Sequence, residues 1–214
     1  CMQNTRKIVH FFERRVNIKI QKKSKGYNRL LDNYDAIPYD FYDLHKFLRE
    51  KPEIILPLIM EWFNKQDWLF QWEASHLIKN IFPEFEEPLK KYLNDLTEKG
   101  NIEDARKVLR IIKEYKATAN TYETCKSLIK KYVENQELMR ELMSVLTQTG
   151  VVFGEYGFVE AYKGIKKEVR KWQKPKNEEI RKFVREFVRY IDALIIRETK
   201  RADDNKELMI RRFK

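Results

Sequence analysis

The sequence predicts an all-α protein, and three observations lead to this fold class. From residue 52 onward, apolar residues recur at spacings of three and four, which is the period of helices with one buried face. Hydrophobic residues make up 43% of the chain, so a sizeable core can form. The 214 residues include only 6 Gly and 6 Pro, too few for the many turns of a protein built from short strands.

The first 50 residues are predicted to form a helical extension. The stretch "RKIVHFFERRVNIKI" (6–20) has helical apolar spacing, and a polar connection separates it from a short helix around residues 39–49. No apolar run nears the roughly 20 residues that a membrane span needs, and the N-terminal apolar stretch is too short for a signal peptide. We therefore expect no membrane association.

The cysteine usage points to a reducing compartment. Cys1 and Cys125 are too few and too far apart for a disulfide framework or a zinc site, so we expect a cytoplasmic protein. Because the first residue is not Met, we also expect the chain to be a fragment or to carry a tag remnant, and to form part of something larger.

Four short polar residues are predicted to begin new helices. Asp67, Asn101, Asn135 and Asn177 each precede an amphipathic stretch, where their side chains can accept hydrogen bonds from the free N–H groups of the first turn. The third, fourth, seventh, tenth and eleventh residues after each cap are mostly apolar, although the pattern is looser after Asn101. These residues are Phe70, Gln71, Ala74, Leu77 and Ile78; Asp104, Ala105, Val108, Ile111 and Ile112; Leu138, Met139, Leu142, Val145 and Leu146; and Ile180, Arg181, Val184, Phe187 and Val188.

A further helix is expected before each capped helix, at about 52–65, 84–98, 121–133 and 155–172. The caps lie 34, 34 and 42 residues apart, a period typical of stacked supersecondary units. We therefore predict an α-solenoid of about four helix pairs over residues 51–200. The last helix meets no Gly or Pro after Asn177, so residues 201–214 are predicted to be its polar extension.

The four capped helices resemble the second helices of HEAT and armadillo-like repeats. The shared pattern is a turn Asp or Asn, an aliphatic residue, often Arg, and then small or apolar residues; "DWLFQWEASHLI" and "NEEIRKFVREFV" match it best. The resemblance covers about residues 51–200 and implies an extended curved surface that binds proteins or nucleic acids. The 34-residue period is also that of tetratricopeptide repeats, but their ordered Trp, Leu, Gly, Tyr, Ala and Pro positions are missing.

No residue pattern predicts catalysis, a metal site or a cofactor. His10, His45 and His76 stand far apart without metal-ligand or triad spacing; we expect His76 at the edge of the core and His45 on the surface. The segment "GVVFGEYGFVEAYKG" (150–164) holds four of the six glycines but lacks a phosphate-loop pattern and a preceding strand. It therefore predicts a turn between helices, and we expect a protein that is not an enzyme.

The net charge of +11 is concentrated near the two ends of the chain. Residues 6–25 hold eight Lys or Arg against one acid, and residues 163–189 hold eleven against four, whereas residues 26–162 hold 18 against 23. A basic face can bind nucleic acid or an acidic protein, whereas interleaved Glu residues indicate a solvated face. The candidate binding residues surround the expected turn between the last two helices: Lys163, Lys166, Lys167, Arg170, Lys171, Lys174, Lys176, Lys182 and Arg185.

Two functions remain open at this point. The first is a binding module or scaffold for a protein partner, within a larger prokaryotic assembly such as an antiviral defence system; this rests on the HEAT-like resemblance alone. The second is nucleic-acid binding through the basic ends. It would be favoured if the basic segments merged on one face, and disfavoured if Glu residues interrupted them. The sequence does not predict the oligomeric state.

The nucleic-acid hypothesis includes a resemblance to HEAT-like DNA glycosylases that act on alkylated bases. Some of these enzymes place Trp and Asp near the damaged base, and "WFNKQDWLFQW" holds Asp67 between Trp62 and Trp68. Asp67 also fits as a helix cap, which is the interpretation we favour. Most of the aromatic residues Trp62, Trp68, Phe70 and Trp72 are expected in the core, and one left exposed would be a hot spot on a protein interface.

Overall fold

The computed structural model describes residues 2–24, 34–116, 118–173 and 177–212. These residues form ten α-helices and two short 3-10 helices and contain no strand, which confirms the predicted all-α class. No helix within these ranges has the length and hydropathy of a membrane span. The chain divides into two compact units, Cys1–Leu96 (unit 1) and Thr97–Lys214 (unit 2), which we describe one at a time.

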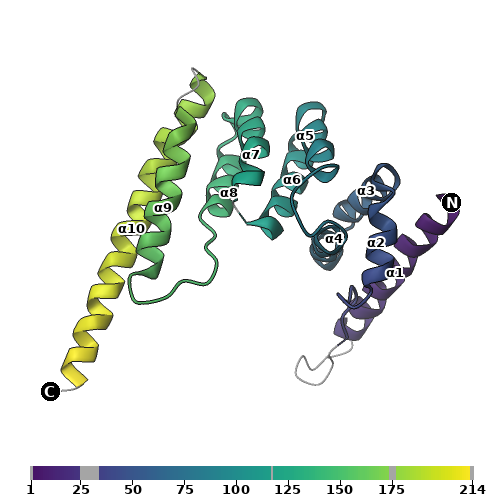
Figure 1. Ribbon diagram of the computed structural model, residues 1–214, viewed down its shortest axis with the longest axis horizontal. Coiled ribbons are helices and arrows are strands. Elements are labelled where there is room, and N and C mark those ends of the chain that lie inside the picture. The colour runs from purple at the N-terminus through teal and green to yellow at the C-terminus, as the bar shows by residue number, and fades with distance from the viewer. Residues whose placement is uncertain (1, 25–33, 117, 174–176, 213–214) are drawn as a thin grey trace. The chain divides into compact units, whose positions relative to one another are not determined.

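Unit 1 contains the helices at the N-terminal end of the chain (Figure 1). In order these are α1 (Met2–Ser24), α2 (Tyr42–Arg49), α3 (Pro52–Met60), the 3-10 helix η1 (Glu61–Asn64), α4 (Trp68–Ile81) and the first part of α5 (Leu89–Lys99). Helix α1 packs against α3 and α4, and α2 packs against the same two helices. Phe12 and Val16 of α1 are fully buried, so the basic helix α1 contributes its apolar face to this core.

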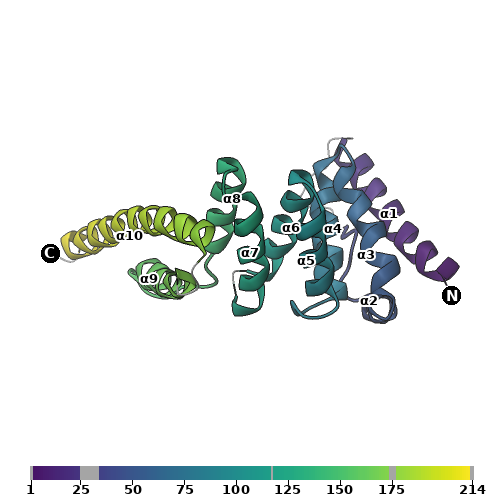
Figure 2. The same cartoon turned by 90° about the horizontal axis from the view of Figure 1, so that it is seen from above.

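Unit 2 contains α6 (Ile102–Tyr115), α7 (Ala119–Tyr132), α8 (Gln136–Leu146), α9 (Gly157–Arg170), the 3-10 helix η2 (Lys171–Gln173) and α10 (Glu178–Arg212). Helices α6, α7 and α8 pack on one another, and α10 packs on α7, α8 and α9. Figures 1 and 2 both show α9 lying beside α10, so these two helices present one long shared surface.

All four predicted caps are confirmed. The side-chain Oδ1 atoms of Asp67, Asn135 and Asn177 accept hydrogen bonds from backbone N–H groups in the first turns of α4, α8 and α10, at 2.8–2.9 Å. Asn101 accepts from Glu103 and Asp104, and the Asp104 carboxylate accepts from the Asn101 N–H, which completes a capping box at the start of α6.

The apolar offsets after the caps are also confirmed as core positions. Every apolar residue in the four predicted sets is buried except Val188, which is half-buried. The polar members, Gln71, Asp104 and Arg181, are half-buried. Periodicity therefore identified the buried face of each capped helix.

Three of the four predicted helix pairs pack as pairs: α3 with α4, α7 with α8, and α9 with α10. The fourth pair is α5 and α6, and the division between the two units falls within α5, after Leu96. Helix α5 begins at Leu89, later than the predicted residue 84. The cause is local, because Pro88 disfavours helical dihedral angles at Glu87.

Candidate functional site

A groove between α9 and α10 is lined by six of the basic residues in the segment 163–189. We call it the α9–α10 groove; it consists of two adjoining pockets that share Arg170. Its lining contains six cationic side chains and one carboxylate. The lining residues are Lys163, Lys166, Lys167, Arg170 and Gln173 from α9 and η2, and Arg185, Val188, Arg189, Asp192 and Ile195 from α10.

The helical period explains why these side chains meet. On α9 the four cations occupy positions i, i+3, i+4 and i+7 from Lys163, which share one face of a helix. On α10 the lining residues follow the same spacing from Arg185. The opposite face of α10 is buried through Phe183, Phe187 and Ile191, so packing of the core turns the cations toward α9 and solvent.

Carboxylates already pair with half of the groove cations. Lys163 Nζ lies 2.8 Å from Glu160, Arg185 lies 3.1 Å from Glu178, and Lys166 pairs with Asp192 across the two helices. Within the described ranges, Lys167, Arg170 and Arg189 have no ion-pair partner. These three cations are therefore free to meet an incoming anion.

The remaining predicted binding residues do not all belong to this groove. Lys171 pairs with Glu168 at 2.6 Å, one turn before it on the chain. Lys182 points away from the groove and pairs with Glu134 at 2.8 Å; this hydrogen bond raises the pKa of Lys182. Lys174 and Lys176 lie outside the residues that the structure describes.

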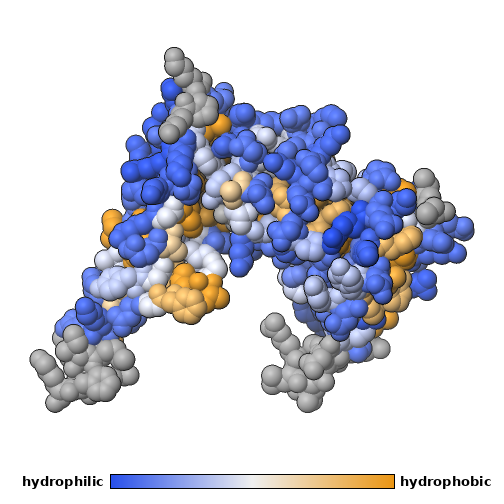
Figure 3. Space-filling model, in the orientation of Figure 1, coloured by the Kyte–Doolittle hydropathy of each residue, from blue (hydrophilic) through white to orange (hydrophobic). Residues whose placement is uncertain are grey.

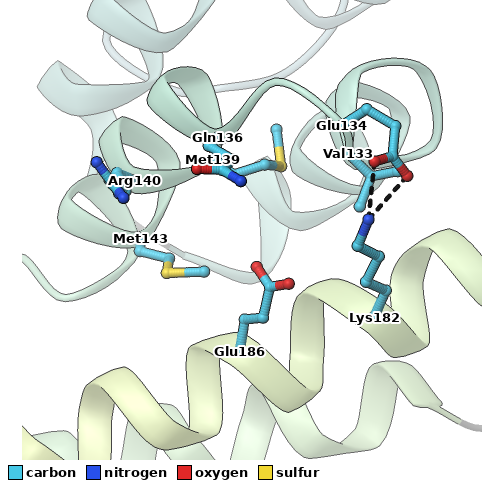
Figure 4. Close-up of a pocket in the computed structure, with 8 residues that line it drawn as sticks. All are labelled: Val133, Glu134, Gln136, Met139, Arg140, Met143, Lys182 and Glu186. Carbon is cyan, nitrogen blue, oxygen red and sulfur yellow. Dashed lines mark hydrogen bonds and ion pairs between the residues drawn. The ribbon is translucent and has the colours of Figure 1, made fainter.

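Lys182 lines a separate pocket between α8 and α10 (Figure 4). Met139 and Met143 of α8 form its apolar side, and Lys182 reaches from α10 to Glu134 at its edge (Figure 4). Glu186 points into the same space, so the charges that line this pocket are mixed. The arrangement favours neither an anion nor a cation.

Unit 1 holds a second surface of interest on α4. Trp62 and Phe70 are buried as expected, but Trp68 is 57% exposed and Trp72 is 43% exposed. Two lysines of α1 lie against these rings: Lys23 Nζ is 4.3 Å from the Trp68 ring centroid and Lys19 Nζ is 4.9 Å from that of Trp72. We call this surface the Trp68–Trp72 face.

A buried ion pair lies next to the Trp68–Trp72 face. Glu73 is 1% exposed, and its Oε1 atom accepts a hydrogen bond of 2.6 Å from Lys19 Nζ. Burial raises the pKa of Glu73, and the bond to Lys19 opposes that rise. Lys19 therefore neutralises a carboxylate inside unit 1 and contacts Trp72 at its surface.

One histidine prediction is wrong. His45 is buried, not on the surface, and its ring stacks on Phe12 with the centroids 5.6 Å apart. Among the residues that the structure describes, its Nε2 atom has no hydrogen-bond partner, and burial lowers its pKa, so His45 is a neutral core residue. His76 is half-buried against Trp72, as expected.

The glycine-rich segment forms the predicted turn. Gly154 has φ +76°, in the left-handed region that favours glycine, and its carbonyl accepts a bond of 3.1 Å from Gly157, where α9 begins. Val151 and Phe153 in this segment are exposed, and Figure 3 shows the apolar patch over the loop that leads into α9.

Two groups that are often used in catalysis, Asp67 and Cys125, have structural roles in this protein. Asp67 Oδ1 caps α4, which is the interpretation that the sequence favours. Cys125 is fully buried, and burial raises the pKa of its thiol to about 12. The residues described contain no cluster of three or more side chains suited to a metal ion.

Comparisons of this chain with protein-family models, with curated proteins and with solved structures found no match.

Proposed function

We propose that the chain is a HEAT-like α-solenoid whose function is to bind a protein partner. Four caps at repeat spacing, and buried residues at matching offsets after them, support this proposal. Each repeat unit of a solenoid exposes the helix faces that do not pack on its neighbours, and such faces form binding surfaces. A module of this kind fits a larger assembly, including a prokaryotic antiviral one.

The α9–α10 groove carries the proposal. Its six cations surround Val188 and Ile195, which are half-buried and provide an apolar contact at the base. A partner that matches both features is a helical segment with carboxylates along its sides and aliphatic residues between them. We therefore propose that the groove binds an acidic, amphipathic helix of another protein.

The ion pairs in the groove favour an acidic protein over nucleic acid. Glu160, Glu178 and Asp192 stand beside the cations, and each would repel a continuous line of phosphates. A peptide helix can place its few carboxylates opposite Lys167, Arg170 and Arg189 and leave the existing pairs intact.

A charge-reversal experiment tests the groove. The probe is a fluorescein-labelled synthetic helix with Glu on its sides and Leu along one stripe, and binding is followed by fluorescence anisotropy at moderate salt. Lys167→Glu with Arg170→Glu should weaken binding at least tenfold, because both free cations become repulsive. Binding to the unchanged protein should weaken as salt is added.

The matched control keeps the charge change but moves it. Arg110 and Lys113 are exposed on α6 of the same unit and have no ion-pair partner within the described ranges. Arg110→Glu with Lys113→Glu should change affinity less than about threefold, through net charge alone. Equal losses in both double variants would sink the proposal, and so would a duplex DNA that binds more tightly than the acidic helix.

A further inference from the structure

The Trp68–Trp72 face combines exposed rings with lysines in a way that the core does not require. Trp68 and Trp72 lie one turn apart on the outer side of α4, whereas Leu69, Phe70 and Ala74 of the same helix fill the core. Burial of large aromatic rings is favourable, so two neighbouring exposed tryptophans on one helix indicate a contact surface. No role in the proposed protein-binding groove accounts for them.

The charges around the two rings select an anionic ligand. Lys19 and Lys23 lie within 5 Å of the ring centroids. The nearest carboxylates in the sequence of α4 are already used, because Asp67 caps the helix and Glu73 is buried against Lys19. The surface thus offers flat apolar rings and positive charge without a free carboxylate from either of these residues.

Single-stranded nucleic acid has both of the features that this surface can bind. Its unpaired bases stack on aromatic side chains, and its phosphates contact lysines. A neighbouring phosphate can draw Lys23 outward from the Trp68 ring, which frees ring surface for a base, whereas Lys19 stays bonded to Glu73. An acidic peptide supplies the charge but no flat rings in a regular series.

The spacing of the rings favours a single strand over a duplex. Four residues separate Trp68 from Trp72, which is about 6 Å along a helix that rises about 1.5 Å per residue. Bases stacked in a duplex repeat at about 3.4 Å and are closed to side chains on both faces. Two helix positions about 6 Å apart can present their rings to bases that are splayed from one another, as unpaired strands allow.

We propose that the Trp68–Trp72 face binds single-stranded nucleic acid, with one base stacked on each tryptophan and a neighbouring phosphate on Lys23. This site lies in unit 1 and is independent of the acidic helix proposed for the α9–α10 groove. Because stacking is available to all four bases, binding is tolerant of sequence.

The test uses the full chain and a fluorescein-labelled oligothymidine of about 20 nucleotides, long enough for a site of a few bases. Anisotropy gives the affinity, and quenching of tryptophan emission reports stacking. The double variant Trp68→Ala, Trp72→Ala should bind at least tenfold more weakly. Trp68→Phe with Trp72→Phe keeps two rings and should retain affinity to within about threefold of the unchanged protein, well above the alanine variant.

Two controls separate stacking from charge and from misfolding. Phe153→Ala removes a still more exposed ring from unit 2 and should leave affinity unchanged. Lys167→Glu with Arg170→Glu should abolish acidic-helix binding but change oligothymidine binding less than about threefold. The far-UV circular dichroism spectrum should be the same for all variants, because every replaced side chain is exposed.

Several results would overturn the proposal. One is an unchanged affinity for oligothymidine after both tryptophans are replaced by alanine. Another is equal affinity for a duplex of the same length, which would indicate charge alone. The proposal would also be overturned if the protein bound neither oligothymidine nor oligouridine. The same holds if it bound anionic lipid vesicles but neither oligonucleotide.

Discussion

The two basic segments of the chain differ in what their cations contact. In α1, Arg15 donates hydrogen bonds to the carbonyls of Asp35 and Ala36 and lies 4.9–5.7 Å from three aromatic rings. Lys19 neutralises a buried glutamate. In the basic segment at residues 163–189, by contrast, Lys163, Lys171 and Arg185 pair with carboxylates whose side chains are 45–69% exposed.

This difference shows that equal charge density can serve two purposes. A cation bonded to backbone carbonyls and rings of its own unit stabilises that unit, because its removal leaves buried acceptors without a donor. A cation paired on the surface contributes little to stability and remains available for exchange with a ligand. Charge counts along the sequence do not separate these cases.

The largest predicted effect is in unit 1, for Lys19→Met. This change leaves Glu73 buried without its partner and should lower the free energy of unfolding by about 3 kcal/mol, toward the low end for buried pairs because Lys19 is partly exposed. Urea denaturation followed by circular dichroism measures the loss. Adding Glu73→Gln to this variant should recover most of it, because the unpaired charge is removed.

The loss of stability caused by Lys19→Met should depend on pH. Burial already raises the pKa of Glu73 above its ordinary value of 4.5, and loss of Lys19 raises it further. The folded protein then binds the proton more tightly than the unfolded chain, so stability is greatest below pH 4.5 and falls as pH rises through the raised pKa. The loss in free energy of unfolding caused by Lys19→Met should therefore become smaller as the pH is lowered toward 4.5. A loss that is independent of pH would contradict this account of Glu73.

Arg15→Ala should have the next largest effect. Two charge-assisted hydrogen bonds to carbonyls and the ring contacts are lost, and we expect about 2 kcal/mol of destabilisation. Arg170→Ala in the α9–α10 groove is the matched change and should alter stability by less than about 0.5 kcal/mol. If the two variants unfold at the same urea concentration, the contrast between the basic segments is wrong.

Asn177→Ala should cost about 1 kcal/mol, because the first turn of α10 loses the side chain that accepts the Ile180 N–H. Asn177→Asp keeps an acceptor and should stay within a few tenths of a kcal/mol. Thermal unfolding monitored by circular dichroism compares the two. This pair separates the contribution of the helix terminus from that of the cations beside it.

The smallest effect is expected for Lys163→Ala. Its pair with Glu160 is more than half exposed on both sides, so removal should change stability by roughly 0.3 kcal/mol or less. The same variant should weaken binding of the acidic probe helix, since Lys163 lines the groove. A loss of stability as large as that of Arg15→Ala would show that the surface pairs hold unit 2 together.

Local features of the fold were predictable from the sequence because their causes are local. The caps need one short polar side chain, and the buried faces need only helical spacing. The late start of α5 was also predictable, since Pro88 restricts the residue before it. The division of the chain inside α5 had no such signal, because it depends on which distant helices pack together.

The candidate sites were predictable in part. Helical spacing from Arg185 points to Arg189, which we did not single out, but the pairing of Lys166 with Asp192 requires the register of two helices. The sequence did indicate that Trp68 and Trp72 are exposed. They stand one and five residues after the Asp67 cap, and neither position is one of the offsets (three, four, seven, ten and eleven) that are mostly buried in the capped helices. His45 lacked any comparable sign, because its burial depends on Phe12 of α1.

Three of the four helix caps are asparagines, and asparagine is subject to slow deamidation. Asparagine side chains lose ammonia slowly in water through a cyclic imide, which opens to aspartate or to isoaspartate. Aspartate at Asn135 or Asn177 caps a helix equally well and suits its positive end, whereas isoaspartate adds a carbon to the backbone and disturbs the cap. At Asn101 even the aspartate product is unfavourable, because its new carboxylate would face that of Asp104 within the same capping box. Both products therefore weaken the start of α6, whereas the fold tolerates aspartate at the other two positions.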